Sequence, residues 1–238
     1  MNWRCLLCAY CAMWLAENVQ AATVFSVETI AAPAGPAGSA YSPVHPAGGP
    51  SSIDLLNSAS PVDQSGNFQQ EASTGVSALT NGSIDTFYGT AFETDNHTAY
   101  ATGDASDAGQ FVTYNLGAAY NLSSVVTFGG WADGGRDQQL YDVLTSTDGV
   151  NFNTLASFAG VNVGGGTPIS HRVALTEDSL PHLATGVTHI RINFLDVENN
   201  FTGYTEIDVF GTPVPEPASA VLIIAGILGR VAPRRRAF

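Results

Sequence analysis

The sequence of 238 residues contains no lysine, and all eight of its basic residues are arginines. Five of these lie near the two ends, so the part from Ala22 to Pro213 has three arginines against 19 acidic residues, a difference of −16. Nucleic-acid binding requires a basic surface that neutralises phosphates, so this composition excludes that class of function. A net negative charge instead favours solubility and the binding of cations.

Cysteine is absent after residue 11. Cys5, Cys8 and Cys11 lie in an apolar run that follows Arg4 and precedes small residues at 21–22. A short positive start, an apolar stretch and a small-residue cleavage point predict a secretory signal peptide over residues 1–21. The alternative is a Cys-x-x-Cys metal or redox site, which needs a second ligand cluster. The mature chain would then have no disulfide and would depend on a packed core.

Long helical repeats are also lacking. Residues 22–52 are predicted to form a linker or extended arm, because Ala, Pro, Gly and Ser dominate this segment from residue 31 on. His45 within it is expected to lie in solvent. Residues 53–212 hold short alternating apolar runs separated by turn residues, which predict a half-buried antiparallel β-sandwich. The faces predicted to be shared are Val112/Tyr114/Leu116, Leu122/Val126/Phe128, Ile169/His171/Val173/Leu175, Ile190/Ile192/Phe194 and Ile207/Val209.

Three further details follow from this strand pattern. Asp148 and Gly149 predict a tight hairpin turn, because glycine supplies the positive φ that such a turn needs. His171 lies on an apolar face and is expected to be a hydrogen-bonded core histidine. Arg172 and Arg191 lie opposite the apolar residues and are expected to form ion pairs with the abundant acids.

Three stretches, taken in order, resemble the discoidin-like, or coagulation-factor type C, domain. They are ALTNGSIDTFYGT; QFVTYNLGAAYNLSSVVTF followed by YDVLTSTDGVNFNTLASF; and GVTHIRINF with GYTEIDVFG. The resemblance covers roughly residues 55–211 and implies a galactose-binding-like jelly roll, a fold used mainly to bind glycans or other surface ligands. Because a fold alone does not give a function, the site residues have to be considered separately.

The same resemblance implies a calcium site at Asn81, Ser83 and Glu206, with Asp85 nearby. Calcium takes six to eight oxygen ligands, several of them carboxylates. Asn81 stands where the family usually has an aspartate, which removes one negative charge. The alternative is a neutral turn at Asn81 and a Glu206 that is hydrogen-bonded locally.

Two loops hold candidate ligand-binding residues. Trp131 could stack on a sugar ring while Asp133 and Arg136 bind its hydroxyls, since binding sites combine an apolar platform with a few polar groups. The alternative is that Trp131 covers the core and Arg136 fixes a loop. Residues 93–107, with His97 and Tyr100 among several acids, could bind a cation or a glycan, or could form an acidic solvated loop.

Catalysis has little support in the sequence. The mature chain has no cysteine nucleophile and no lysine base, and it lacks the Gly-x-Ser-x-Gly and His-Glu-x-x-His motifs. We therefore expect a non-enzymatic carbohydrate-binding or exopolysaccharide-matrix protein. A purely structural matrix component, or a polysaccharide hydrolase that uses an unrecognised pair of carboxylates, is the alternative.

The C-terminal segment 213–238 contains a Pro-Glu-Pro triplet, an apolar run and an arginine cluster. The apolar run, residues 218–232, predicts a short hydrophobic helix and is shorter than the ~20 residues of a stable membrane span. The order of these features resembles the PEP-CTERM sorting signal, with Pro215, Glu216, Pro217, Arg234, Arg235 and Arg236 as its signature. This resemblance implies transient residence in the inner membrane, processing by an exosortase, and export to the cell surface or extracellular matrix of a Gram-negative bacterium.

Overall fold

The computed structural model describes residues 23–31, 39–69, 73–88, 99–102, 110–130, 137–160, 169–195 and 201–215. Its elements are β1 (Thr23–Ala31), β2 (Ser39–Tyr41), β3 (Asp63–Ser65), the 3-10 helix η2 (Val76–Thr80), β4 (Thr86–Tyr88), β5 (Ala99–Thr102), β6 (Gln110–Gly130), β7 (Tyr141–Ser146), β8 (Asn153–Phe158), β9 (Ile169–Glu177), β10 (Ala184–Phe194) and β11 (Phe201–Pro213).

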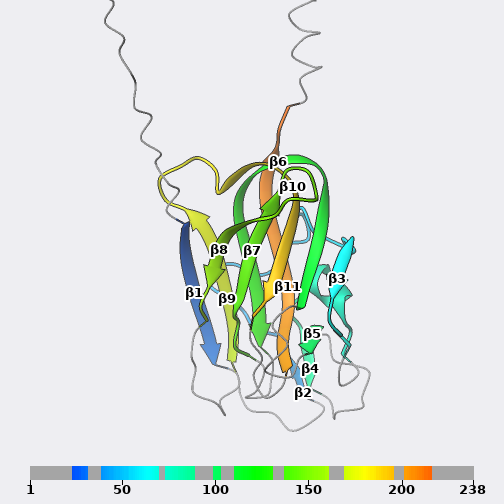
Figure 1. Ribbon diagram of the computed structural model, residues 1–238. Coiled ribbons are helices and arrows are strands. Elements are labelled where there is room, and N and C mark those ends of the chain that lie inside the picture. The colour runs from blue at the N-terminus through cyan, green and yellow to red at the C-terminus, as the bar shows by residue number, and fades with distance from the viewer. Residues whose placement is uncertain are drawn as a thin grey trace, which may run out of the picture.

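The strands form an antiparallel sandwich in which β6 belongs to both layers (Figure 1). The first part of β6 pairs with β10 and β3, and the second part pairs with β9 and β11. Between these parts the strand arches over the upper end of the molecule (Figure 1), where Gly117 has a φ of 78° that a residue with a side chain rarely adopts. One layer is therefore β3-β6-β10-β7-β8 and the other is β1-β9-β6-β11-β5.

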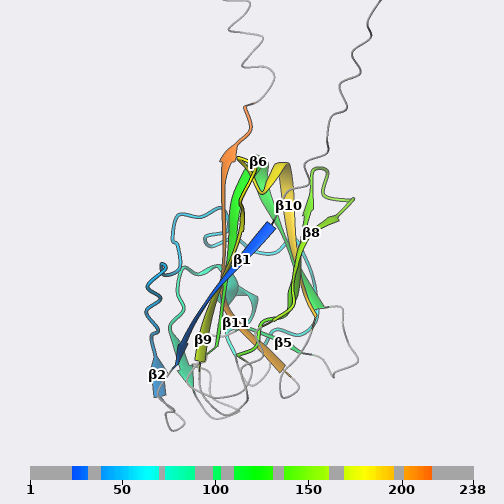
Figure 2. The same cartoon turned by 90° about the vertical axis from the view of Figure 1, so that its left-hand side faces the viewer.

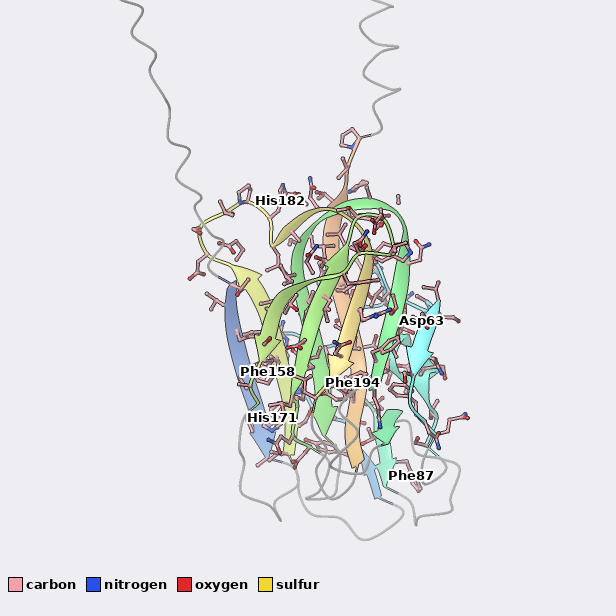
Figure 3. The ribbon with its side chains drawn as sticks, viewed as in Figure 1. Asp63, Phe87, Phe158, His171, His182 and Phe194 are labelled. Carbon is pink, nitrogen blue, oxygen red and sulfur yellow. The ribbon has the colours of Figure 1, made fainter. Side chains whose placement is uncertain are left out.

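The core lies between these two layers, and it confirms most of the predicted strand faces. The fully buried residues at its centre, which come from both layers, are Val112, Tyr114, Val143, Val173, Leu175, Ile190, Ile192, Ile207 and Val209. Phe158 and Phe194 also point into the sandwich (Figure 3). Phe25 of β1 lies against Phe158 of β8, with ring centroids 5.1 Å apart, so it closes the open side between the two edge strands. The all-β antiparallel prediction is thus confirmed.

One predicted face is wrong. Leu122 packs in the core between the layers, whereas Val126 and Phe128 belong to a second small cluster that also contains Ile84 and Ala174. The cause is a register shift between Leu122 and Ser124, where β6 pairs with β11. Such a bulge changes which face the following residues occupy, so an alternation counted through it fails. Val126 and Phe128 lie on the outer side of the sheet, and they are buried nonetheless.

Residues 39–54, which we call the arm from here on, cover this outer side. The arm runs as an extended segment along the sheet that contains β9 and β11 (Figure 2). His45 is only 3% exposed, its ring lies 5.6 Å from that of Phe128, and its Nε2 is 3.0 Å from the Ser170 hydroxyl. The expectation that His45 is solvated was therefore wrong, because polar groups of the sheet provide partners for its ring. The preceding residues 23–31 form β1, which pairs with β9 along its whole length.

The remaining expectations about the fold concern single residues and the termini. The hairpin turn is confirmed, since Gly149 has a φ of 76° and Asp148 Oδ1 accepts the Asn151 N–H at 2.8 Å. His171 is 1% exposed and bonded to the Thr29 hydroxyl, and Arg191 pairs with Asp63 at 3.0 Å, both as expected. In the described part of the chain no helix is long and apolar enough to cross a membrane. The predicted signal peptide (residues 1–21), and residues 216–238 with the predicted hydrophobic helix and sorting signal, lie outside the described residues.

Candidate functional site

Many strand ends meet at the lower end of the sandwich (Figure 1). The last residue of β6, Gly130, pairs with Ser170 near the start of β9, and Gly129 pairs with Tyr204 near the start of β11. Likewise the last residue of β10, Phe194, pairs with Gln110, the first of β6. Phe87 of β4 lies at the same end, whereas His182 lies at the opposite end (Figure 3). We call this end, defined by residues 88, 99, 110, 130, 169, 194 and 201, the strand-end edge.

The predicted ligand-binding residues belong to the connections that start from this edge. Trp131, Asp133 and Arg136 directly follow Gly130, but they and His97 lie outside the described residues. Tyr100 is part of β5, opposite Gly203 of β11. The strands that flank the two candidate loops therefore end together at one edge of the fold.

The base of the loop that holds Trp131 is fixed on both sides. A Cβ on Gly130 would lie 1.9 Å from the Ile169 carbonyl oxygen, so only glycine fits there, and its φ is 96°. On the other side of the loop the Gln139 amide accepts the Thr127 hydroxyl at 2.6 Å and donates to the His171 carbonyl at 3.1 Å. The described residues on both sides of the loop are thus fixed, and preorganisation of this kind lowers the entropic cost of holding a ligand.

A second notable feature is a cluster of buried carboxylates on the outer face of β11. Glu206 and Asp208 are 0% and 1% exposed. One oxygen of each accepts a backbone N–H at 2.9 Å, from Gly82 for Glu206 and from Ser51 for Asp208. Asp54 of the arm is half-buried beside them and accepts the Leu56 N–H at 2.7 Å. The other oxygen of each of the three carboxylates has no hydrogen-bond partner within the described part of the chain.

The surroundings strongly disfavour the charged form of these groups. Burial, and then the charge of Asp208, raise the pKa of Glu206 to about 9, although the Gly82 N–H partly offsets this. Burial and the charge of Asp54 raise the pKa of Asp208 to about 7, with an opposing effect from the Ser51 N–H and Arg172. Burial likewise raises the pKa of Asp54. Near neutral pH the cluster would therefore take up protons or bind a cation.

Glu206 and the segment of residues 81–86 offer oxygen donors of the chemical type that calcium takes. Glu206 Oε1 and the hydroxyl of Thr86, which is 3% exposed, are buried oxygens that lack a partner in the described residues. The Asn81 and Ser83 side-chain oxygens accept backbone N–H groups at 2.8 and 3.1 Å, which keeps the loop closed beside Glu206, whereas Asp85 is exposed. No group of three or more His, Cys, Asp or Glu side chains in the described residues is arranged to hold a metal. A calcium ion here would depend on hydroxyl and carbonyl oxygens besides the Glu206 carboxylate.

The buried histidine of the arm is part of a Ser–His–Glu chain. Ser170 Oγ lies 3.0 Å from His45 Nε2, and His45 Nδ1 lies 3.2 Å from Glu28 Oε2. This order of groups matches a nucleophile, its base and an orienting acid. Ser170, however, is 1% exposed, so a substrate carbonyl cannot approach its hydroxyl. The chain of hydrogen bonds acts instead as a tether that holds the arm to β1 and β9.

Comparison with known families identifies the fold. The F5/8 type C domain matches residues 62–207, which is more than half of the chain. The protein belongs to the F5/8 type C domain family. The matched region begins just before β3 and ends within β11, so β1 and the arm lie N-terminal to it. The coagulation-factor type C resemblance is thereby confirmed, and no curated protein matches the chain.

Several solved structures are similar to this F5/8 type C chain at low sequence identity. The C-terminal domain of a Bacteroides fragilis chitobiase is 13% identical, with a TM-score of 0.47, and the match covers 68% of this chain and 98% of that one. The family 32 carbohydrate-binding module of Streptococcus pneumoniae EndoD is 11% identical, with a TM-score of 0.45 and coverage of 67% and 99%. CpGH89CBM32-5 from Clostridium perfringens, in complex with GalNAc-β-1,3-galactose, is 18% identical, with a TM-score of 0.36 and coverage of 48% and 74%.

Sequence reasoning missed three residues of this part of the molecule, namely Asp54, Thr86 and Asp208. Asp208 was placed correctly on the face opposite Ile207 and Val209, but that face was expected to be solvated. Its burial depends on Ser51 and Asp54, which are more than 150 positions away in the chain. Thr86 is the first residue of β4, directly after the loop of the predicted ligands, so a threonine next to that loop was the available signal.

Proposed function

We propose that this F5/8 type C protein is a non-catalytic carbohydrate-binding module whose ligand site is the strand-end edge. The observation that carries the proposal is that the strands flanking the two candidate loops end together at that edge, with a base fixed by Gly130 and Gln139. The site would combine the Trp131 ring with the polar groups of Asp133, Arg136, His97 and Tyr100. An aromatic platform with a few polar groups is the usual composition of a small-molecule site.

A glycan array probed with the purified chain tests this function. We expect binding to one or a few related glycans, and at least a tenfold loss of affinity in Trp131→Ala, because stacking on the ring supplies much of the buried area of a sugar site. A chain that binds no glycan would favour a purely structural matrix role instead. Release of reducing sugar from a bound polysaccharide would contradict the non-catalytic part of the proposal.

We further propose that calcium stabilises the 81–85 loop by binding to oxygens of that loop, of Thr86 and of Glu206. When bound, the ion supplies positive charge to buried carboxylates that are otherwise costly to ionise. Asn81 supplies one negative charge less than the aspartate usual in the family. The neighbouring carboxylates of Asp208 and Asp54 supply negative charge at the same place, which supports the proposal.

Export and sorting form the last part of the proposal. We infer that the signal peptide directs the chain across the inner membrane, and that an exosortase cleaves near Pro215–Pro217 and releases the domain to the cell surface or matrix. In support, β11 ends at Pro213 and the Val214 N–H donates to the Ala119 carbonyl at 2.8 Å, so the sheet is complete before the triplet. Mass spectrometry of the exported protein is expected to find a C-terminus near residue 217, and an intact Phe238 terminus would contradict the inference.

A further inference from the structure

A pocket of about 410 Å³ lies on the flank of the sandwich, away from the strand-end edge. It is lined by residues 58–61 and 64, the last of which belongs to β3, and by residues 76, 77, 80 and 81 of η2 and its C-terminal end. Figure 1 shows β3 on the side of the molecule, and Asp63 marks the same flank in Figure 3. The volume is within the range of small-molecule sites, roughly 300–1,000 Å³.

The wall of this pocket is held in a strained conformation. Ser58 has a φ of 58°, the left-handed region, and it is the one non-glycine residue of the described chain with a positive φ. Its N–H donates to the Thr80 carbonyl at 2.6 Å, and the Thr80 hydroxyl donates to the Ala59 carbonyl at 2.8 Å. Two hydrogen bonds between the facing segments thus fix the strained residue. Strain of this kind, about 1–3 kcal/mol, persists where the surrounding structure requires it, and it clusters at ligand sites.

The lining has the chemistry of a site for an uncharged polyhydroxylated ligand. None of the described residues that line the pocket is charged. The hydroxyls of Ser58, Ser60 and Ser77 and the amide of Gln64 face solvent, and they make no side-chain hydrogen bond within the described part of the chain. Between them lie the apolar groups of Ala59, Pro61 and Val76.

We propose that this flank pocket binds one or two units of a neutral saccharide, as a site separate from the strand-end edge. The free hydroxyl and amide groups exchange hydrogen bonds with sugar hydroxyls, and the apolar lining contacts the C–H faces of the ring. Among the lining residues that the structure describes, a phosphate or a carboxylate ligand would find no cation to pair with, and a metal ion would find no carboxylate. The pocket does not depend on the loop that holds Trp131, so it functions whether or not that loop binds a glycan.

The test is a titration of the ¹⁵N-labelled chain with lactose, cellobiose and maltose, followed by amide NMR shifts. We expect saturable shifts at Ser58, Ser60, Gln64 and Ser77 with at least one of these sugars. Ser77→Leu fills the pocket and is expected to weaken this binding at least tenfold, whereas Ser123→Leu, an exposed serine on β6, is expected to leave it unchanged. Gln64→Ala provides a second variant in case Ser77→Leu alters the dispersed spectrum of the folded chain.

The outcomes separate this site from the proposed function. Shifts confined to Gly130, Ile169 and their neighbours at the strand-end edge would overturn the flank site and support the edge. Shifts confined to the pocket would support the flank site without the edge. Absence of saturable pocket shifts with all three sugars, or shifts that persist at full strength in both pocket variants, would overturn the inference.

Discussion

Replacing Glu206 with glutamine is expected to stabilise the calcium-free protein at alkaline pH. Glutamine keeps an oxygen for the Gly82 N–H and replaces the unpartnered Oε1 by an uncharged NH₂ group. The amide therefore resembles the protonated acid, and the variant removes the need to ionise a buried group. A large-to-small core substitution would leave a cavity, but this exchange preserves volume.

The magnitude follows from the pKa of Glu206, which is raised from its ordinary value of 4.5 to about 9. The folded state binds the Glu206 proton more tightly than the unfolded state does. Protonation of Glu206 therefore stabilises the fold fully below about pH 4.5, and this stabilisation is lost as the pH rises toward 9. One pKa unit corresponds to about 1.4 kcal/mol, so the wild type in chelator should lose roughly 2–5 kcal/mol of unfolding free energy between pH 5 and pH 8. Glu206→Gln should lose much less.

Guanidinium unfolding at pH 5 and pH 8, with EDTA and with calcium, measures these free energies. Calcium is expected to restore the stability of the wild type at pH 8, because it favours the ionised carboxylates, and to have little effect on Glu206→Gln. Asp178→Asn is the matched control, because Asp178 is exposed, and it should follow the wild type. Identical pH dependence in wild type and Glu206→Gln would refute the reasoning, and an unchanged response to calcium would refute the proposed calcium site.

Two further perturbations test the arm and the base of the loop. His45→Ala removes the contacts with Ser170, Glu28 and Phe128, so it should cost about 2–4 kcal/mol of stability and make the arm sensitive to protease. The control His182→Ala, at the opposite end of the sandwich, should be nearly neutral. An unchanged melting temperature in His45→Ala would contradict the tether. Gly130→Ala should destabilise the fold by more than about 3 kcal/mol, because its Cβ would meet the Ile169 carbonyl. Gly117→Ala, where a Cβ would enter open space, should cost only about 1 kcal/mol. Equal melting temperatures of the two variants would contradict the close approach at Gly130.

Strand periodicity predicted the interior of this F5/8 type C domain well. Alternation places Ile190, Ile192 and Phe194 inward, because side chains on a strand alternate between its faces and only one face meets the other layer. The same counting failed for Val126 and Phe128, because the bulge in β6 shifts the phase and the arm buries a face that would otherwise be solvated. Bulges depend on pairing between distant strands, so one strand's own sequence does not reveal them.

The sites were less predictable because they depend on long-range contacts. Asn81 and Glu206 were associated through the family resemblance, and the structure does bring Glu206 to the Asn81–Gly82 loop. The burial of Asp208 and His45 depends on an arm whose composition has no periodicity, so nothing local marked either residue as buried. The flank pocket arises from a backbone conformation at Ser58 that serine does not favour, and no sequence pattern indicates it.

Calorimetric titration with an array-selected glycan tests the central claim most directly, because it compares the wild type, Trp131→Ala and Ser77→Leu under one set of conditions. The account predicts saturable binding by the wild type, a loss of at least tenfold for Trp131→Ala, and retained edge binding for Ser77→Leu. Wild-type affinity in Trp131→Ala, or no heat of binding with any glycan that the array selects, would contradict the assignment of the strand-end edge as a carbohydrate site.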